Sequence, residues 1–339
     1  MIFYNKRKNK NQNPKDIKFL KNLVSDATSD ISDNTFCIFK SINDIFYLIY
    51  STFDNSIISY NIINYKKVNI IKFAHKGKIL ILKHNFDKKN NRDLFISMSK
   101  EKSFSYNIKL WNVNNFECLL ELNNIYGYII SSCFLNDNNS LYILTSNNPI
   151  EVIDLKGNII KNFKNVDNSI YFIDTYNDDK NSKIYILTGH LGLVKSYDYY
   201  KNKVYHKYQD NNKDKKEHYS LVINNNESII NLIDSCYDGY IRIWNFHKGL
   251  LLSKIKAGYG SMGICLWNTN YIFVGCCDNV IRLLELNKGY IIKSLTGHNK
   301  GVSCIKTINH PKYGECLISI EISVILNLSK IKLWIINKI

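Results

Sequence analysis

The sequence predicts an all-β protein built from one strand-rich unit that repeats along the chain. Short runs rich in Ile, Val, Leu, Tyr and Phe alternate with clusters of Asn, Asp, Lys and Gly, which is the pattern of strands joined by turns. None of these runs is as long as a typical helix. They include Ile45–Ser51, Leu94–Ser97, Leu141–Thr145, Ile184–Thr188, Ile229–Ser235 and Tyr271–Gly275. We therefore expect strands throughout the chain.

The turns of this protein must be formed largely without glycine. The chain of 339 residues has 15 Gly and 3 Pro but 47 Asn. Asn is the non-glycine residue that best tolerates a positive φ. We expect turns at Asn136–Asn139, Asn147–Asn148 and Asn224–Asn226.

A motif recurs after each predicted strand: a polar turn, then Ile-x-hydrophobic, then an aromatic or large apolar residue. The clearest copy is Asp238–Asn245 (DGYIRIWN). The position of Trp244 is occupied in the other copies, 40 to 51 residues apart, by Tyr60, Trp111, Ile153, Tyr197, Leu284 and Trp334. The motif resembles the WD40 repeat, which has a period of about 40–45 residues and four strands per blade. The resemblance implies one seven-bladed β-propeller over residues 15–339, preceded by a basic, disordered tail at residues 1–14.

The two ends of the chain predict how the ring closes. Only five residues follow Trp334, too few for the outer strand of the seventh blade. A strand-like segment, Asp16–Leu23 (DIKFLKNL), lies near the N-terminus. We expect it to complete the last blade, because closure removes unpaired sheet edges.

The WD40 resemblance also implies polar networks inside the blades. The family's Gly-His dipeptide is similar to Gly297–His298 and, more weakly, to Ala74–His75. Each His is then expected to bond a Ser and, through it, the Trp of its blade. This implies the sets His75, Ser97 and Trp111; His298, Ser319 and Trp334; and a weaker copy, His218, Ser235, Asp238 and Trp244. We interpret these sets as structural, since buried polar groups need partners, and we disfavour a catalytic Ser–His–Asp reading.

Charge and cysteine usage limit the possible classes of protein. The formal net charge is +16 and the pI about 9.2, which is compatible with nucleic-acid binding. Arg occurs only at positions 7, 92, 242 and 282, and Lys lacks the planar fork that recognises bases, so we disfavour that role. Nine cysteines without a CxxC pair predict reduced thiols. The charged start and the lack of an 18-residue apolar run predict no export signal and no transmembrane segment, so we expect an intracellular protein, with the cytoplasm favoured over the nucleus.

No motif in the sequence predicts an enzyme. P-loop, HExxH, GxSxG and kinase signatures are lacking, and we expect no cofactor and no metal. Gly258–Gly263 matches GxGxxG, but only Ile264–Asn270 separates it from the next strand, which is too short for the phosphate-binding helix.

We therefore expect an interaction scaffold or adaptor that uses loops at one end of the ring to bind a protein or peptide partner, of acidic character or within a larger complex. The expected contact residues are Lys76, Lys78, Lys100, Lys102, Tyr126, Tyr237, Tyr259 and Lys300. Lysines would steer an acidic segment and tyrosines would anchor it. The alternative is an electrostatic binder of nucleic acid or anionic lipid through a lysine-rich face.

Overall fold

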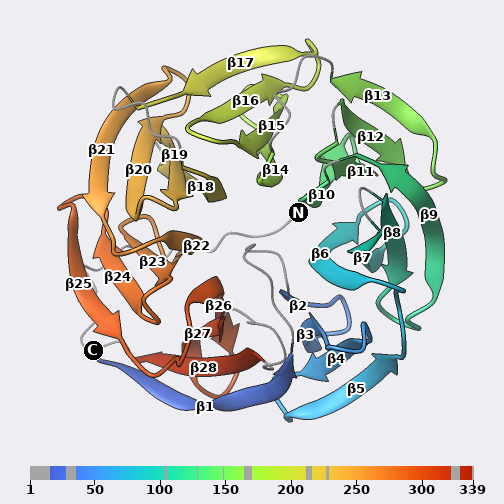
Figure 1. Cartoon of the computed structure of the whole chain (residues 1–339), viewed down its shortest axis with the longest axis horizontal. Coiled ribbons are helices and arrows are strands. Elements are labelled where there is room, and N and C mark those ends of the chain that lie inside the picture. Colours follow the sequence, from blue (N-terminus) through green and yellow to red (C-terminus); the bar gives the residue numbers. More distant parts are fainter. Residues whose placement is uncertain are drawn as a thin grey trace.

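The strands form a closed ring of seven four-stranded sheets (Figure 1). The computed structural model describes residues 16–27, 36–102, 105–127, 129–147, 149–163, 170–210, 216–226, 229–321 and 329–337. These residues form strands and turns and no helix. The tail predicted at residues 1–14 lies outside them, so the boundary between tail and propeller stays a prediction.

Each sheet is an antiparallel blade whose four strands are ordered from the centre of the ring to its rim (Figure 1). The innermost strands are β2 (Phe36–Lys40), β6 (Lys78–Asp87), β10 (Ser132–Asp137), β14 (Phe172–Asp178), β18 (His218–Asn226), β22 (Ser261–Leu266) and β26 (Val302–His310). The second strands are β3 (Phe46–Ser51), β7 (Arg92–Lys102), β11 (Ser140–Thr145), β15 (Lys183–Gly189), β19 (Ile229–Cys236), β23 (Tyr271–Cys276) and β27 (Gly314–Glu321).

The third and outermost strands complete the blades. The third strands are β4 (Ile57–Asn61), β8 (Ser105–Asn112), β12 (Ile150–Asp154), β16 (Val194–Asp198), β20 (Tyr240–Asn245), β24 (Ile281–Glu285) and β28 (Ser329–Asn337). The outermost strands are β5 (Lys66–Ile71), β9 (Cys118–Tyr126), β13 (Ile159–Phe163), β17 (Lys203–Tyr208), β21 (Leu250–Lys256), β25 (Tyr290–Leu295) and β1 (Asp16–Ala27). The predicted seven-bladed architecture is confirmed.

The N-terminal strand closes the ring as predicted. β1 lies beside β28 at the rim (Figure 1) and gives that sheet the order β1-β28-β27-β26. The pairing runs antiparallel from Asp16 opposite Asn337 to Ala27 opposite Ser329. The strand is therefore longer than the predicted segment Asp16–Leu23.

The hydrophobic core lies between neighbouring blades, so the inner strands are buried on both faces. In β3, the consecutive residues Leu48, Ile49 and Tyr50 are all buried. Leu48 and Tyr50 pack in the cluster that includes Ile318, whereas Ile49 packs on the other side with Phe95. Side chains alternate between the two faces of a strand, and here each face meets another blade. This explains the continuous apolar runs in the sequence.

Asparagine supplies many of the tight turns. Asn138 and Asn139, in the β10–β11 turn, have φ values of 46° and 66°, as the sequence predicts. The expected turn at Asn224–Asn226 is wrong, because the β18–β19 ladder continues until Asn226 lies opposite Ile229.

Candidate functional site

All the predicted contact residues lie at one end of the ring. Because neighbouring strands are antiparallel, the loops that lead into the innermost strands share one end with the loops between second and third strands. We call this end, marked by Lys76, Lys100 and Lys102, the lysine face. The opposite end, which carries the β6–β7 and β10–β11 turns, is the turn face.

Four lysines gather on the lysine face at the end of one long blade. Its strands β6 and β7 have 10 and 11 residues. Lys78 begins β6 directly opposite Lys100 of β7, and Lys102 lies two residues further along. Gly77 allows the loop before β6 to come close to the end of β7, since a Cβ atom at this position would lie 2.0 Å from the Lys100 carbonyl oxygen.

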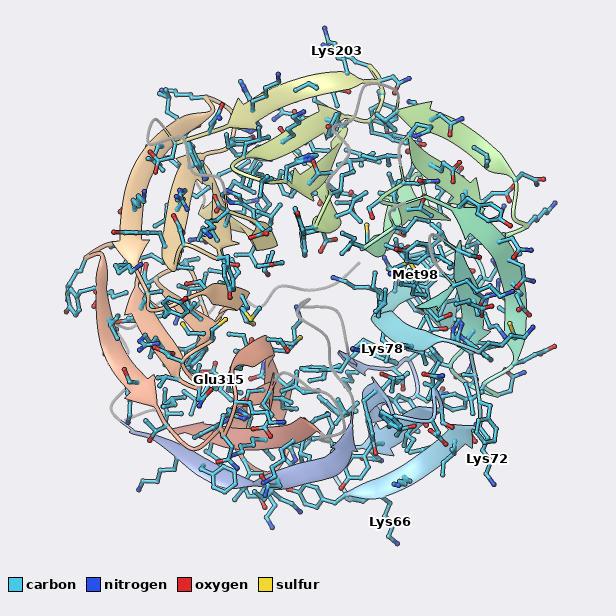
Figure 2. All side chains as sticks on the ribbon, in the orientation of Figure 1. Lys66, Lys72, Lys78, Met98, Lys203 and Glu315 are labelled. Carbon is cyan, nitrogen blue, oxygen red and sulfur yellow. The ribbon has the colours of Figure 1, made fainter. Side chains whose placement is uncertain are left out.

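These lysines form a concentrated positive patch. All four side chains are exposed, and in the described part of the chain no carboxylate lies within 4.0 Å of Lys76, Lys100 or Lys102. Like charges directly opposite each other destabilise a sheet. Figure 2 shows Lys78 toward the axis of the ring, whereas Lys66 and Lys72 project from the rim.

Two exposed aromatic residues lie near these lysines on the same face. Tyr126 ends β9, where it pairs with Ser105, the residue opposite Lys102, and its exposed fraction is 69%. Phe73, which the sequence analysis missed, lies in the loop before β6 with an exposed fraction of 73% and a φ of 49°. Its backbone N–H donates to Ser56 Oγ at 3.0 Å. This loop therefore presents an apolar ring to solvent on the lysine face.

A second aromatic group lies on the other side of the lysine face. Tyr259 is 72% exposed, whereas Tyr237 is half-buried. The Tyr237 ring meets Tyr219 edge-on at 6.1 Å, and Tyr219 meets Tyr171 in the same way at 5.9 Å. Burial and the charge of Glu217 raise the pKa of Tyr219, so its hydroxyl stays neutral. The sequence analysis missed Tyr171 and Tyr219, because contacts between blades bring these rings together and no local pattern marks them.

Lys300 is not presented to solvent as the sequence analysis expected. The residue is half-buried, and its Nζ atom is shielded from solvent without a hydrogen-bond partner. The residues just before it are held by Glu321, whose Oε2 lies 3.1 Å from His298 Nδ1 and accepts from the Asn299 N–H at 3.2 Å. We therefore remove Lys300 from the set of exposed contacts.

Two of the implied polar networks are present in the blades. His75 Nε2 lies 2.6 Å from Ser97 Oγ, which accepts from Trp111 Nε1 at 2.8 Å. In the seventh blade, His298 Nε2 lies 2.7 Å from Ser319 Oγ, which accepts from Trp334 Nε1 at 2.8 Å. Both serines are buried, so neither hydroxyl is open to a substrate.

The third network differs from the expectation by one residue. Asp234, not Ser235, lies 2.7 Å from His218 Nδ1 and accepts from Trp244 Nε1 at 2.5 Å. Ser235 donates instead to the Met262 carbonyl oxygen at 2.7 Å, and Asp238 forms an ion pair with Arg242.

Strand register explains this correction. Asp234 lies opposite the residue two places before its tryptophan, as Ser97 and Ser319 do in their blades. A shift of one residue moves a side chain to the other face of a strand. Ser235 therefore lies on the face of β19 opposite to the network, and Asp234 takes the position that was expected for it.

The buried histidines predict a loss of stability in mild acid. Burial and the charge of Lys109 lower the pKa of His75 to about 3, and burial also lowers the pKa of His298. An unfolded His accepts a proton near pH 6.5, so the unfolded state binds more protons below that pH, and the unfolding free energy falls as the pH falls. For His75 alone, the loss between pH 7.5 and pH 5 is about 2 kcal/mol. Urea unfolding at the two pH values gives the change in unfolding free energy between them. In His75→Gln this change should be smaller than in the parent protein by that amount. An unchanged difference would contradict this account.

The described residues contain no helix long and apolar enough to cross a membrane. They also contain no group of three His, Cys, Asp or Glu side chains that could hold a metal ion. All nine cysteines are free. Burial raises the pKa of Cys276 to about 11, which keeps that thiol protonated.

Comparison with known proteins shows one distant similarity. No model of a known protein family matches the sequence. The chain is 21% identical over 199 residues to autophagy-related protein 16 of Arabidopsis thaliana. The match covers 58% of this chain and 30% of the relative, so the chain spans about a third of that protein. The chain is thus a seven-bladed β-propeller closed by its N-terminal strand, and this similarity supports its assignment as a WD40-repeat propeller.

Proposed function

We propose that this propeller is a non-catalytic intracellular scaffold whose lysine face binds an acidic segment of a partner protein. The observation that carries the proposal is the patch of Lys76, Lys78, Lys100 and Lys102 at the end of the long blade. Clustered charges of one sign raise association rates with a partner of opposite charge. The exposed rings of Phe73, Tyr126 and Tyr259 supply aromatic anchors on the same face.

The similarity to an autophagy-related protein suggests where to seek the partner first. That relative is matched over 30% of its length, so its partners do not transfer to this chain directly. An autophagy complex is nevertheless the first setting that we would test.

Nucleic-acid binding is the alternative, and two of the four arginines weigh against it. The terminal nitrogens of Arg242 and Arg282 are bonded to Asp238 and Asp278. Guanidinium groups occupied in this way do not offer a fork to bases or phosphates. The net charge of +16 therefore supports non-specific attraction more than specific recognition.

A charge-reversal experiment tests the proposal. In Lys76→Glu/Lys100→Glu/Lys102→Glu, capture of the partner from cell lysate at moderate salt should fall at least about tenfold, because each charge-assisted contact contributes about 1.5–3 kcal/mol. Quantitative mass spectrometry of the captured proteins is the measurement.

The matched control is Lys18→Glu/Lys66→Glu/Lys203→Glu, which changes the net charge equally at exposed positions away from the patch. This control should retain the partner. Equal loss in both variants, or capture of nucleic acid that salt abolishes, would overturn the proposal.

A further inference from the structure

A cavity on the turn face lies between two blades, away from the lysine face. It has a volume of about 350 Å³ and opens between the β6–β7 turn, the start of β11 and the β12–β13 turn. Ligand pockets usually begin at about 300 Å³, so this cavity has room for one small organic molecule.

A buried carboxylate holds an arginine in the wall of this cavity. Asp87 is buried and accepts from Arg92 Nε at 3.0 Å and from Asn90 Nδ2 at 2.8 Å. Burial would raise the pKa of Asp87, but these bonds outweigh it and lower the pKa below its usual value. In the described part of the chain, the terminal nitrogens of Arg92 have no hydrogen-bond partner. The guanidinium is thus fixed at one edge with its fork unused.

Two lysines add positive charge around the same cavity. Lys89 and Lys156 both line it, and both residues are exposed. The described residues provide no hydrogen-bond or ion-pair partner for either ammonium group. The second carboxylate of the wall, Asp154, already accepts from the Lys156 N–H, the Asn158 N–H and Asn158 Nδ2. The charged groups left for a ligand are therefore the cationic ones.

The remaining wall combines two leucines with the hydroxyl-bearing residues Ser140 and Tyr142. Leu141 is buried and Leu155 is half-buried, and both pack in the core between these two blades while lining the cavity. A ligand that fills the space therefore needs an anionic group for the cations and an apolar or ring-shaped group for the leucines.

A second cavity on the turn face, with a volume of about 220 Å³, does not share the cationic lining of the first. It lies between the next two blades and is lined by Asp137, Asp178 and Asp179 with one lysine, Lys183. Two cavities that both lie between neighbouring blades on the turn face thus carry opposite charge, although the whole chain is basic.

We propose that the cavity between these two blades binds a small organic phosphate monoester, with its phosphate on Arg92, Lys89 and Lys156 and its organic group on Leu141 and Leu155. The fork of an arginine matches two oxygens of a phosphate, and the three cations of the wall outnumber its two carboxylates, Asp87 and Asp154, which favours an anionic ligand. This site is independent of the lysine face.

Isothermal titration calorimetry of the full chain with phenyl phosphate tests the proposal. Phenyl phosphate should bind at one site, and phenyl sulfate, which has the same ring but a single charge, should bind at least about tenfold more weakly. Inorganic phosphate should also bind more weakly, because it leaves the two leucines uncovered.

Three variants locate the site. Arg92→Lys keeps a cation beside Asp87 but removes the fork, and should weaken phenyl phosphate binding about tenfold. Lys89→Gln/Lys156→Gln should weaken it by about tenfold or more without changing the melting temperature, since both side chains are exposed. The charge-matched control, Lys66→Gln/Lys72→Gln at the rim (Figure 2), should bind within about twofold of the parent protein.

Three results would overturn the proposal. The first is no saturable binding at millimolar phenyl phosphate. The second is equal affinity for phenyl sulfate and phenyl phosphate. The third is equal loss of binding in the rim control and in Lys89→Gln/Lys156→Gln, which would show attraction to the net charge alone.

Discussion

Removal of residues 1–27, which carry β1, is expected to destabilise the protein by at least about 5 kcal/mol, comparable to the whole stability of many domains. Ile17, Leu23 and Val24 are buried in this strand, and each such side chain contributes about 1.5–3 kcal/mol. The deletion also exposes the edge of β28, a template for association with other chains. Thermal unfolding and size-exclusion chromatography should show loss of the cooperative transition and aggregation.

A circular permutant tests whether β1 acts through its pairing with β28 and not through its position at the start of the chain. Asp16 lies opposite Asn337, so a short turn can join Asn337 to Asp16 while a new N-terminus is made between residues 28 and 35. β1 and β28 would then form an ordinary hairpin, and the permutant should melt within a few degrees of the parent protein. A truncated protein that unfolds cooperatively at the parental temperature would contradict the importance of closure.

Replacement of Asp234 by Ala is expected to lower the unfolding free energy by about 3–5 kcal/mol, the usual cost of removing one partner from a buried polar pair. His218 and Trp244 both bond to this carboxylate, and neither would have another partner for that nitrogen among the described residues. Ser235→Ala should cost only about 1 kcal/mol, since it loses one hydrogen bond to the Met262 carbonyl oxygen. Urea unfolding of both variants is the measurement.

The blades themselves provide a rescue variant. Asp234→Ser installs the hydroxyl that Ser97 and Ser319 provide at the same register position, and it should recover part of the loss seen in Asp234→Ala. If Ser235→Ala proved the more damaging of the two alanine variants, the assignment of Asp234 to this network would be wrong.

Much of the fold could be predicted from the sequence because its determinants are local. Each blade repeats a strand-and-turn pattern within about 40–50 residues, and Trp111, Trp244 and Trp334 mark equivalent third strands. The closing segment at Asp16 could also be predicted, because the last copy of the motif has no outer strand. Apolar pattern and repeat period were sufficient for these elements.

The tertiary structure alone decided the contacts that the repeat pattern does not mark. The register of β19 against β20 selects Asp234 over Ser235, and contacts with Glu321 hold His298 and Asn299, the residues just before Lys300. The contact between Tyr171 and Tyr219 and the cavity at Arg92 each join neighbouring blades. The physical reason is that facing residues of two blades lie tens of residues apart in the chain. Their contacts depend on strand register and packing between blades, which no single repeat encodes.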